Sequence, residues 1–152
     1  SGSFSEERWK LPSWIFSLKL RDNLKSLDDS VMELYQIFHD CGKPICRTVD
    51  DQGRQHFPDH AAISKRLWLE CSDGSPKALE IAELIGMDMD IHLLSASRVA
   101  EFSTRPQALA LLMTGLCEIH SNAQMFGGID STGFKIKFKN IDRFGSRIVE
   151  AA

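Results

Sequence analysis

The sequence predicts an α+β fold: a single domain with a mixed sheet of about five strands and helices packed mainly on one face. Apolar residues recur with a period of two in some segments and near 3.6 in others, which indicates that strands and helices alternate along the chain. In three of the period-two segments every second residue is polar, as expected for strands with one solvent-exposed face. The 152 residues, 43% of them hydrophobic, are enough to bury one core without disulfides or metals.

The first third of the chain is predicted to form a strand, a helix and a hairpin. Apolar and polar side chains alternate over residues 13–20, which is typical of a strand with one buried face. Apolar residues then recur every three or four positions over 24–41, which predicts a helix. Segments 45–49 and 54–57 flank a short polar stretch that ends in Gly53, and this arrangement favours a hairpin.

The middle of the chain is predicted to form two helices followed by a strand. Pro58 suits the first turn of a helix, which Gly74 would terminate. Ser75 and Pro76 then have the chemistry of an N-cap and a first helical residue, and the apolar stripe that follows predicts a helix up to Gly86. Methionine, isoleucine and leucine alternate with aspartate and histidine over 87–93, which predicts a half-buried strand.

The last third is predicted to end the sheet. A short helix is expected near 97–102, and a core helix with one apolar stripe is expected over 104–119. Phenylalanine and isoleucine alternate with lysine over 134–139, which predicts the final strand. A short helix is expected after Asp142.

The charge balance and the chain ends limit the expected binding partners and cellular location. The net charge is −3, with 18 basic and 21 acidic residues, so any binding of nucleic acid or an anionic surface must use a local basic patch. No apolar run approaches the roughly 20 residues of a membrane helix, and no signal peptide is visible, so we expect no membrane partner and a cytoplasmic or nuclear location. Residues 1–3 resemble the scar of an expression tag, so the domain, residues 4–152, is expected to come from a longer chain.

Asp88, Asp90 and His92 form the first candidate site. Residues two apart on a strand point to the same face, so these oxygen and imidazole ligands could hold Mg²⁺ or Mn²⁺ for phosphotransfer or nuclease chemistry. The alternative is an ordinary solvated sheet face, where alternation requires polar residues.

A second candidate site gathers nitrogen and sulfur ligands of the kind that zinc prefers. Its members are His39, Cys41, Cys46, His56 and His60. The second cysteine pair of a typical zinc site is missing, and Cys41 completes an apolar stripe, so an inert core cysteine is the alternative. His39, Asp40 and Cys41 also offer the residue types of an activated cysteine nucleophile. Neighbouring side chains on a helix point about 100° apart, so these three cannot form a hydrogen-bonded catalytic relay unless the helix ends early.

A row of basic residues is the third candidate site, for nucleic acid or another anion. Its members are Lys135, Lys137, Lys139, Arg143 and Arg147. Such a row can bind phosphates. Lysines on a strand also keep a sheet edge from pairing with another molecule, and the sequence favours this second interpretation, because the aromatic residues of the segment would lie on the opposite face.

No motif is specific enough to name a family or an enzyme class, so no catalytic residue and no cofactor are predicted. The leading hypothesis is a non-catalytic protein-interaction module of a larger intracellular protein, viral proteins included, whose partner is another protein. The first alternative is a nucleic-acid or nucleotide-binding domain that uses the basic row. The second is a metal-dependent phosphotransfer or nuclease domain that uses Asp88, Asp90 and His92.

Overall fold

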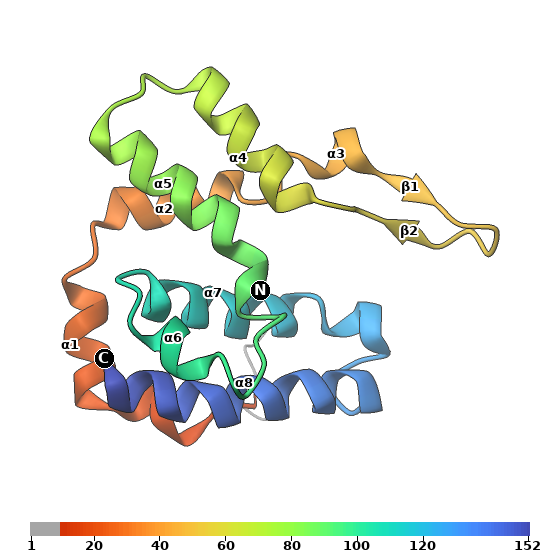
Figure 1. The fold of residues 1–152 in the computed structure, drawn as a ribbon. Coiled ribbons are helices and arrows are strands. Elements are labelled where there is room, and N and C mark those ends of the chain that lie inside the picture. Colours follow the sequence, from red (N-terminus) through yellow and green to blue (C-terminus); the bar gives the residue numbers. More distant parts are fainter. Residues whose placement is uncertain (1–9) are drawn as a thin grey trace, which may run out of the picture. The chain divides into compact units, whose positions relative to one another are not determined.

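The computed structural model describes residues 10–152 and is mostly helical (67%), with one two-stranded antiparallel sheet (Figure 1). The predicted five-stranded mixed sheet with helices on one face is therefore wrong. The predicted tag scar, residues 1–3, lies outside the described residues.

The described elements follow one another as η2 (Ser13–Phe16), α1 (Leu18–Lys25), α2 (Asp29–Phe38), α3 (Lys43–Cys46), β1 (Thr48–Val49), β2 (Gln55–His56), α4 (His60–Cys71), α5 (Pro76–Met87), η3 (Asp88–Asp90), α6 (Val99–Ser103), α7 (Ala108–Ser121), η4 (Ala123–Phe126) and α8 (Thr132–Ala151). They form two compact units. Unit 1 contains the described residues up to Ser26 together with Ile91–Ala152, and unit 2 contains Leu27–Asp90.

Unit 2 is a set of helices built around α5, which packs against both α2 and α4. Ser75 caps α5 by accepting a hydrogen bond from the Ala78 amide, and Pro76 is its first residue, so the helix predicted over 75–86 is confirmed. The Trp68 indole N–H of α4 donates to the Ala78 carbonyl at 2.8 Å, which ties the two helices together close to their connection. Tyr35, Ile81 and Ile85 are fully buried between these helices.

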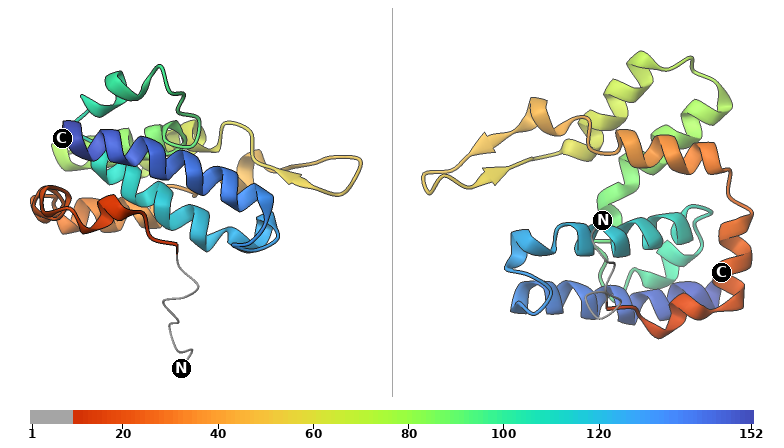
Figure 2. Two further views of the ribbon diagram at one scale, coloured as in Figure 1. Left: turned by 90° about the horizontal axis from the view of Figure 1, so that it is seen from below. Right: turned by 180° about the vertical axis from the view of Figure 1, so that it is seen from behind.

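The hairpin of unit 2 is confirmed, although its strands are short. Thr48 pairs with His56 and Val49 with Gln55 in antiparallel register. The Asp50 carboxylate accepts hydrogen bonds from the amides of Gln52 and Arg54 and so closes the loop. Figure 2 shows the hairpin extending away from the helices of its own unit.

The Asp28 carboxylate, at the start of α2, is expected to make the stability of the fold depend on pH. Its carboxylate accepts hydrogen bonds from the Ser30 hydroxyl and amide and lies 2.9 Å from the Lys77 ammonium. The Ser30 hydroxyl, followed by Lys77, holds the Asp28 pKa well below its ordinary value of 3.8. Because the pKa is depressed in the folded state, the carboxylate stabilises the fold above the unfolded pKa, and this contribution is lost as pH falls toward the folded value.

We expect Asp28→Asn to destabilise the protein at neutral pH and to match the wild type more closely as pH falls below about 4. Chemical denaturation of both proteins at a series of pH values measures the difference. A difference that stays constant across this range would contradict the assignment, and Asp22→Asn, at an exposed position in α1, is the control.

In unit 1, α7 and α8 lie side by side, α6 packs on α8, and η2 and α1 complete the unit (Figures 1 and 2). Its core contains Leu111, Leu112, Ile119, Phe134 and Ile148. Within unit 1 the predicted helices over 97–102 and 104–119 correspond to α6 and α7.

The Trp14 ring seals one side of unit 1 against α8. Its indole N–H donates to the Asp142 carbonyl at 3.1 Å, and the side chain is buried. A Cβ added at Gly145 would lie 2.5 Å from two carbon atoms of the ring. The ring therefore occupies the space that a side chain at position 145 would need.

The predicted strand over 13–20 is instead the short helix η2 followed by the start of α1. Trp14 and Leu20 are buried as expected, but Phe16 is 76% exposed and Leu18 is 65% exposed. Ser17 accepts a hydrogen bond from the Leu20 amide and caps α1, so a local cap interrupts the alternation.

The predicted strand over 134–139 is part of the 20-residue helix α8. Ile136, which strand alternation would bury, is 58% exposed. The buried residues of α8 instead continue from Phe134 through Ile141 and Phe144 to Ile148 at helical spacing. The apolar residues within 134–139 match a period of two, whereas the buried residues over the whole of α8 recur with a period near 3.6.

The predicted strand over 87–93 is the end of α5, the helical turn η3 and an irregular segment. Asp88, which was expected on a solvated face, is 2% exposed, and Leu93, expected to be buried, is 76% exposed. None of the described helices combines the length and the apolar character that crossing a bilayer requires.

Candidate functional site

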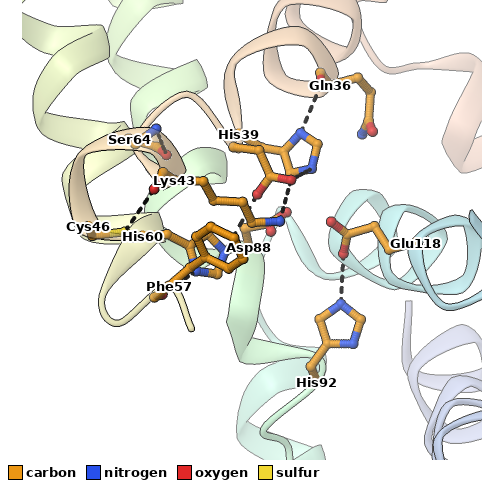
Figure 3. A network of polar contacts seen from close by, with 12 residues as sticks. Gln36, His39, Lys43, Cys46, Phe57, His60, Ser64, Asp88, His92 and Glu118 are labelled. Carbon is orange, nitrogen blue, oxygen red and sulfur yellow. Dashed lines mark hydrogen bonds and ion pairs between the residues drawn. The ribbon is translucent and has the colours of Figure 1, made fainter. Parts of the chain in front are cut away.

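A polar cluster in unit 2 gathers residues from three parts of its sequence (Figure 3). His39 and Asp40 follow the last residue of α2, and Asp88 begins η3 directly after α5. One potential ligand atom of each of these three residues lies within 4.8 Å of the other two. His60, the first residue of α4, approaches Asp40 as well, with its Nε2 atom 3.6 Å from the Asp40 Oδ1 atom. These four residues are called the His39 cluster below.

Backbone carbonyls fix the tautomer of both imidazoles in the His39 cluster. The Nδ1 atom of His39 lies 2.8 Å from the Gln36 carbonyl oxygen, and that of His60 lies 3.1 Å from the Phe57 carbonyl oxygen. A carbonyl oxygen only accepts hydrogen bonds, so Nδ1 carries the proton in each ring. In the neutral rings Nε2 is then the atom with a lone pair, which is the arrangement of a metal-binding histidine.

Asp40 is the centre of the His39 cluster. Its Oδ2 atom accepts a hydrogen bond of 2.6 Å from the Lys43 ammonium and lies 3.5 Å from the His39 Nε2 atom. Its Oδ1 atom is buried and accepts no hydrogen bond from the described residues. The carboxylate thus already attracts one cation, and it faces two imidazoles.

Close packing between α4 and the segment after α2 positions Asp40 and His60. The Gly42 amide donates to the Ser64 hydroxyl at 2.8 Å, and Ser64 is fully buried. A Cβ at Gly42 would lie 2.7 Å from the Ser64 amide nitrogen and 2.9 Å from the His60 carbonyl oxygen. Only a residue without a side chain lets the two segments come this close.

Asp88 is the most buried acid of the His39 cluster, and Tyr35 orients it. The Tyr35 hydroxyl donates to the Asp88 Oδ1 atom at 2.5 Å, and both side chains are buried. A buried carboxylate requires such donors, because its desolvation is costly. The bond fixes the Asp88 carboxylate at the end of α5.

The cysteine-containing zinc set is not assembled. The Cys41 thiol faces the Ser64 carbonyl and the Cys46 thiol faces the Lys43 carbonyl, each at 3.7 Å. His56 is on the exposed hairpin, with its Nε2 atom 2.9 Å from the Asp50 Oδ2 atom, which holds the Asp50 pKa at about 2. Of the predicted set, only His39 and His60 belong to the His39 cluster.

The predicted site of Asp88, Asp90 and His92 does not lie on a strand, because this segment is helical and irregular. Asp88 joins His39 and Asp40, whereas Asp90 and His92 are not members of that group. His92 belongs to unit 1, where its Nε2 atom lies 2.7 Å from the Glu118 carboxylate of α7. The central position of Asp40 was not predicted from the sequence. It depends on α2 ending at Phe38, earlier than the helix expected over 24–41, so that His39 and Asp40 lie beyond the helix.

The basic row lies on α8, and helical geometry reorders it. Lys135, Lys139, Arg143 and Arg147 follow one another at intervals of four residues, and all four are exposed. Successive members are about 6 Å apart along the axis and turn about 40° around it, so they form one continuous stripe. None of the four forms an ion pair with another described residue. These four residues are called the α8 stripe below.

Lys137 does not belong to the α8 stripe. It is two residues from its neighbours in the row, so it projects from a different side of the helix. Its ammonium group lies 5.0 Å from the centre of the Phe126 ring, in cation–π contact. The predicted row of five therefore separates into four aligned cations and one that packs on η4.

A groove in unit 1 adjoins one end of the α8 stripe. Its volume is about 440 Å³, and its lining comes from α6, the residues next to it and the end of α8: Ala96, Val99, Ala100, Ser103, Thr104, Arg147 and Ala151. The lining is made of small side chains, and Arg147 is its only charged residue. The groove offers an apolar recess beside a guanidinium group.

Comparison with protein-family models, with curated proteins and with solved structures finds no match to this chain, so the residues and their geometry alone support what is proposed below.

Proposed function

We propose that this protein binds single-stranded nucleic acid along the α8 stripe. The observation that carries the proposal is the alignment of four exposed cations on one side of a helix without ion-pair partners among the described residues. Surface cations in a line that form no ion pairs are suited to the phosphates of an extended polyanion, whose binding releases condensed counterions. The net charge of −3 makes this stripe a local feature of the surface.

The interpretation favoured by the sequence, protection of a sheet edge, does not apply to α8. The segment is a helix, so it has no strand edge to protect. The groove at Arg147 supports the proposal further, because an apolar recess next to a phosphate-binding cation is a suitable place for a base.

The test is a fluorescence-anisotropy titration with labelled single-stranded RNA and DNA at several salt concentrations. Four phosphate contacts predict that log K falls with log salt concentration with a slope of about −3 for a single strand. We expect Lys135→Gln, Lys139→Gln to reduce the magnitude of this slope by about 1.4, because two phosphate contacts are removed.

Lys137→Gln paired with Lys10→Gln is the matched control, since it removes the same charge from positions outside the α8 stripe. This control should leave the slope nearly unchanged. Absence of binding at low salt would refute the proposal, as would equal effects of the two double variants.

A protein-interaction module is the second candidate, and exposed apolar residues near η2 favour it. Leu11, Phe16 and Leu18 are all more than half exposed, within a segment of eight residues of unit 1. Large apolar side chains that are left exposed are typical of contact sites for other proteins when they form a contiguous patch. Phe16→Asp, Leu18→Asp should abolish binding of a purified partner and leave the salt-dependent binding of nucleic acid unchanged. Retained partner binding would argue against this role.

A further inference from the structure

We propose that the His39 cluster binds a divalent transition-metal ion, with His39, Asp40 and Asp88 as its ligands and His60 as a fourth. This inference goes beyond the proposed function, because it concerns unit 2 and an inorganic ligand, whereas the α8 stripe belongs to unit 1.

The spacing of the donor atoms is close to what a metal ion needs. Ligands about 2.1 Å from a tetrahedral zinc ion are about 3.4 Å apart. One donor atom each from His39, Asp40 and Asp88 already lies within 4.8 Å of the other two, so each pair of donors must approach by at most about 1.4 Å to reach this spacing. The His60 Nε2 atom lies 3.6 Å from the Asp40 Oδ1 atom but is not one of the three mutually close donors, so its ring must move further than theirs to become the fourth ligand.

The surroundings prepare these donors for a cation. The carbonyls of Gln36 and Phe57 hold the proton on Nδ1 of both histidines, which leaves Nε2 as the coordinating atom. Tyr35 orients the Asp88 carboxylate in the way that an outer-shell partner orients a ligand. Two nitrogen and two carboxylate donors match Zn²⁺ and its neighbours in the first transition row rather than Mg²⁺, which prefers oxygen alone.

Lys43 is the intrinsic competitor of the metal. Its ammonium group lies 2.6 Å from the Asp40 Oδ2 atom, where it neutralises the carboxylate. Binding of a metal ion by Asp40 must displace or outweigh this contact, because two cations at one carboxylate repel each other. Removing the ammonium group is therefore expected to strengthen metal binding, whereas loss of a merely structural contact would not.

The experiment is a calorimetric titration of the full chain with Zn²⁺ and, separately, Mn²⁺. We expect one Zn²⁺ ion per chain, an affinity at least tenfold lower in His39→Ala and in Asp40→Asn, and a severalfold higher affinity in Lys43→Met. His56→Ala, which removes the exposed hairpin imidazole, is the matched control and should leave the affinity unchanged.

A Co²⁺ spectrum separates the His39 cluster from a thiolate site. Nitrogen and oxygen ligation predicts d–d bands without a thiolate charge-transfer band, because the Cys41 and Cys46 thiols face carbonyls instead. The proposal is overturned by absence of Zn²⁺ binding, by a thiolate band, or by an affinity that Lys43→Met lowers or that His39→Ala leaves intact. Failure of nucleic-acid binding would not affect these outcomes.

Discussion

Replacing Gly145 by alanine will destabilise the protein by about 1–3 kcal/mol, although the same change normally strengthens a helix. The added Cβ would lie 2.5 Å from the Cε2 and Cζ2 atoms of Trp14, whose ring is buried and hydrogen-bonded to the Asp142 carbonyl. A ring held in this way cannot move aside without exposing apolar surface and losing its hydrogen bond.

Gly133→Ala in the same helix is the matched control. Its Cβ would be 3.5 Å from the nearest atom, in ordinary van der Waals contact with Phe126. We expect this substitution to be neutral or to stabilise α8 by up to about 1 kcal/mol. Denaturant unfolding of both variants measures the effects, and a stabilising Gly145→Ala would show that Trp14 does not occupy this position.

Replacing Gly42 by alanine will destabilise unit 2 by a similar amount, about 1–3 kcal/mol. The backbone of Gly42 has ordinary angles, φ −80° and ψ −16°, so the cost comes entirely from the neighbours. The two shortest contacts of its Cβ would be with backbone atoms of Ser64 and His60, which cannot rotate away. The substitution should also weaken Zn²⁺ binding, because it pushes His60 away from Asp40.

Gly86→Ala is the control within unit 2. The short contact of its Cβ would be with the Cδ atom of Lys65, which belongs to a flexible side chain that can move at little cost. Gly86 is inside α5, so alanine should be neutral or stabilising there. Equal destabilisation by the two substitutions, in denaturant unfolding, would contradict the close approach at Gly42.

Elements whose signals are local were predictable from the sequence. Ser75 and Pro76 start α5 by their own chemistry, and the Asp50 carboxylate closes the hairpin within its own loop. The wrong strand over 134–139 arose because alternation over six residues fits either period when only a few apolar positions are counted. The wrong strand over 13–20 has a different cause, the Ser17 cap that begins α1. In α8 the buried residues after Phe138 decide the period, and they lie beyond the window that suggested a strand.

The His39 cluster could not be predicted in full, since its members come together through packing. Asp40 meets His60 only because Gly42 lies against Ser64, and Asp88 comes near His39 only because α5 packs on α2. Contacts between residues 20 to 50 positions apart leave no periodic trace in the sequence. The α8 stripe, in contrast, is visible as soon as the segment is known to be helical.

The division of the chain also orders the steps of its folding. Unit 1 is discontinuous in sequence: Trp14 precedes unit 2, and its partner Asp142 follows unit 2, 128 residues after Trp14. During synthesis, all of unit 2 is made before the first residue of α8. The contact between Trp14 and α8 can therefore form only after all of unit 2 has been synthesised, so unit 1 is completed later than unit 2.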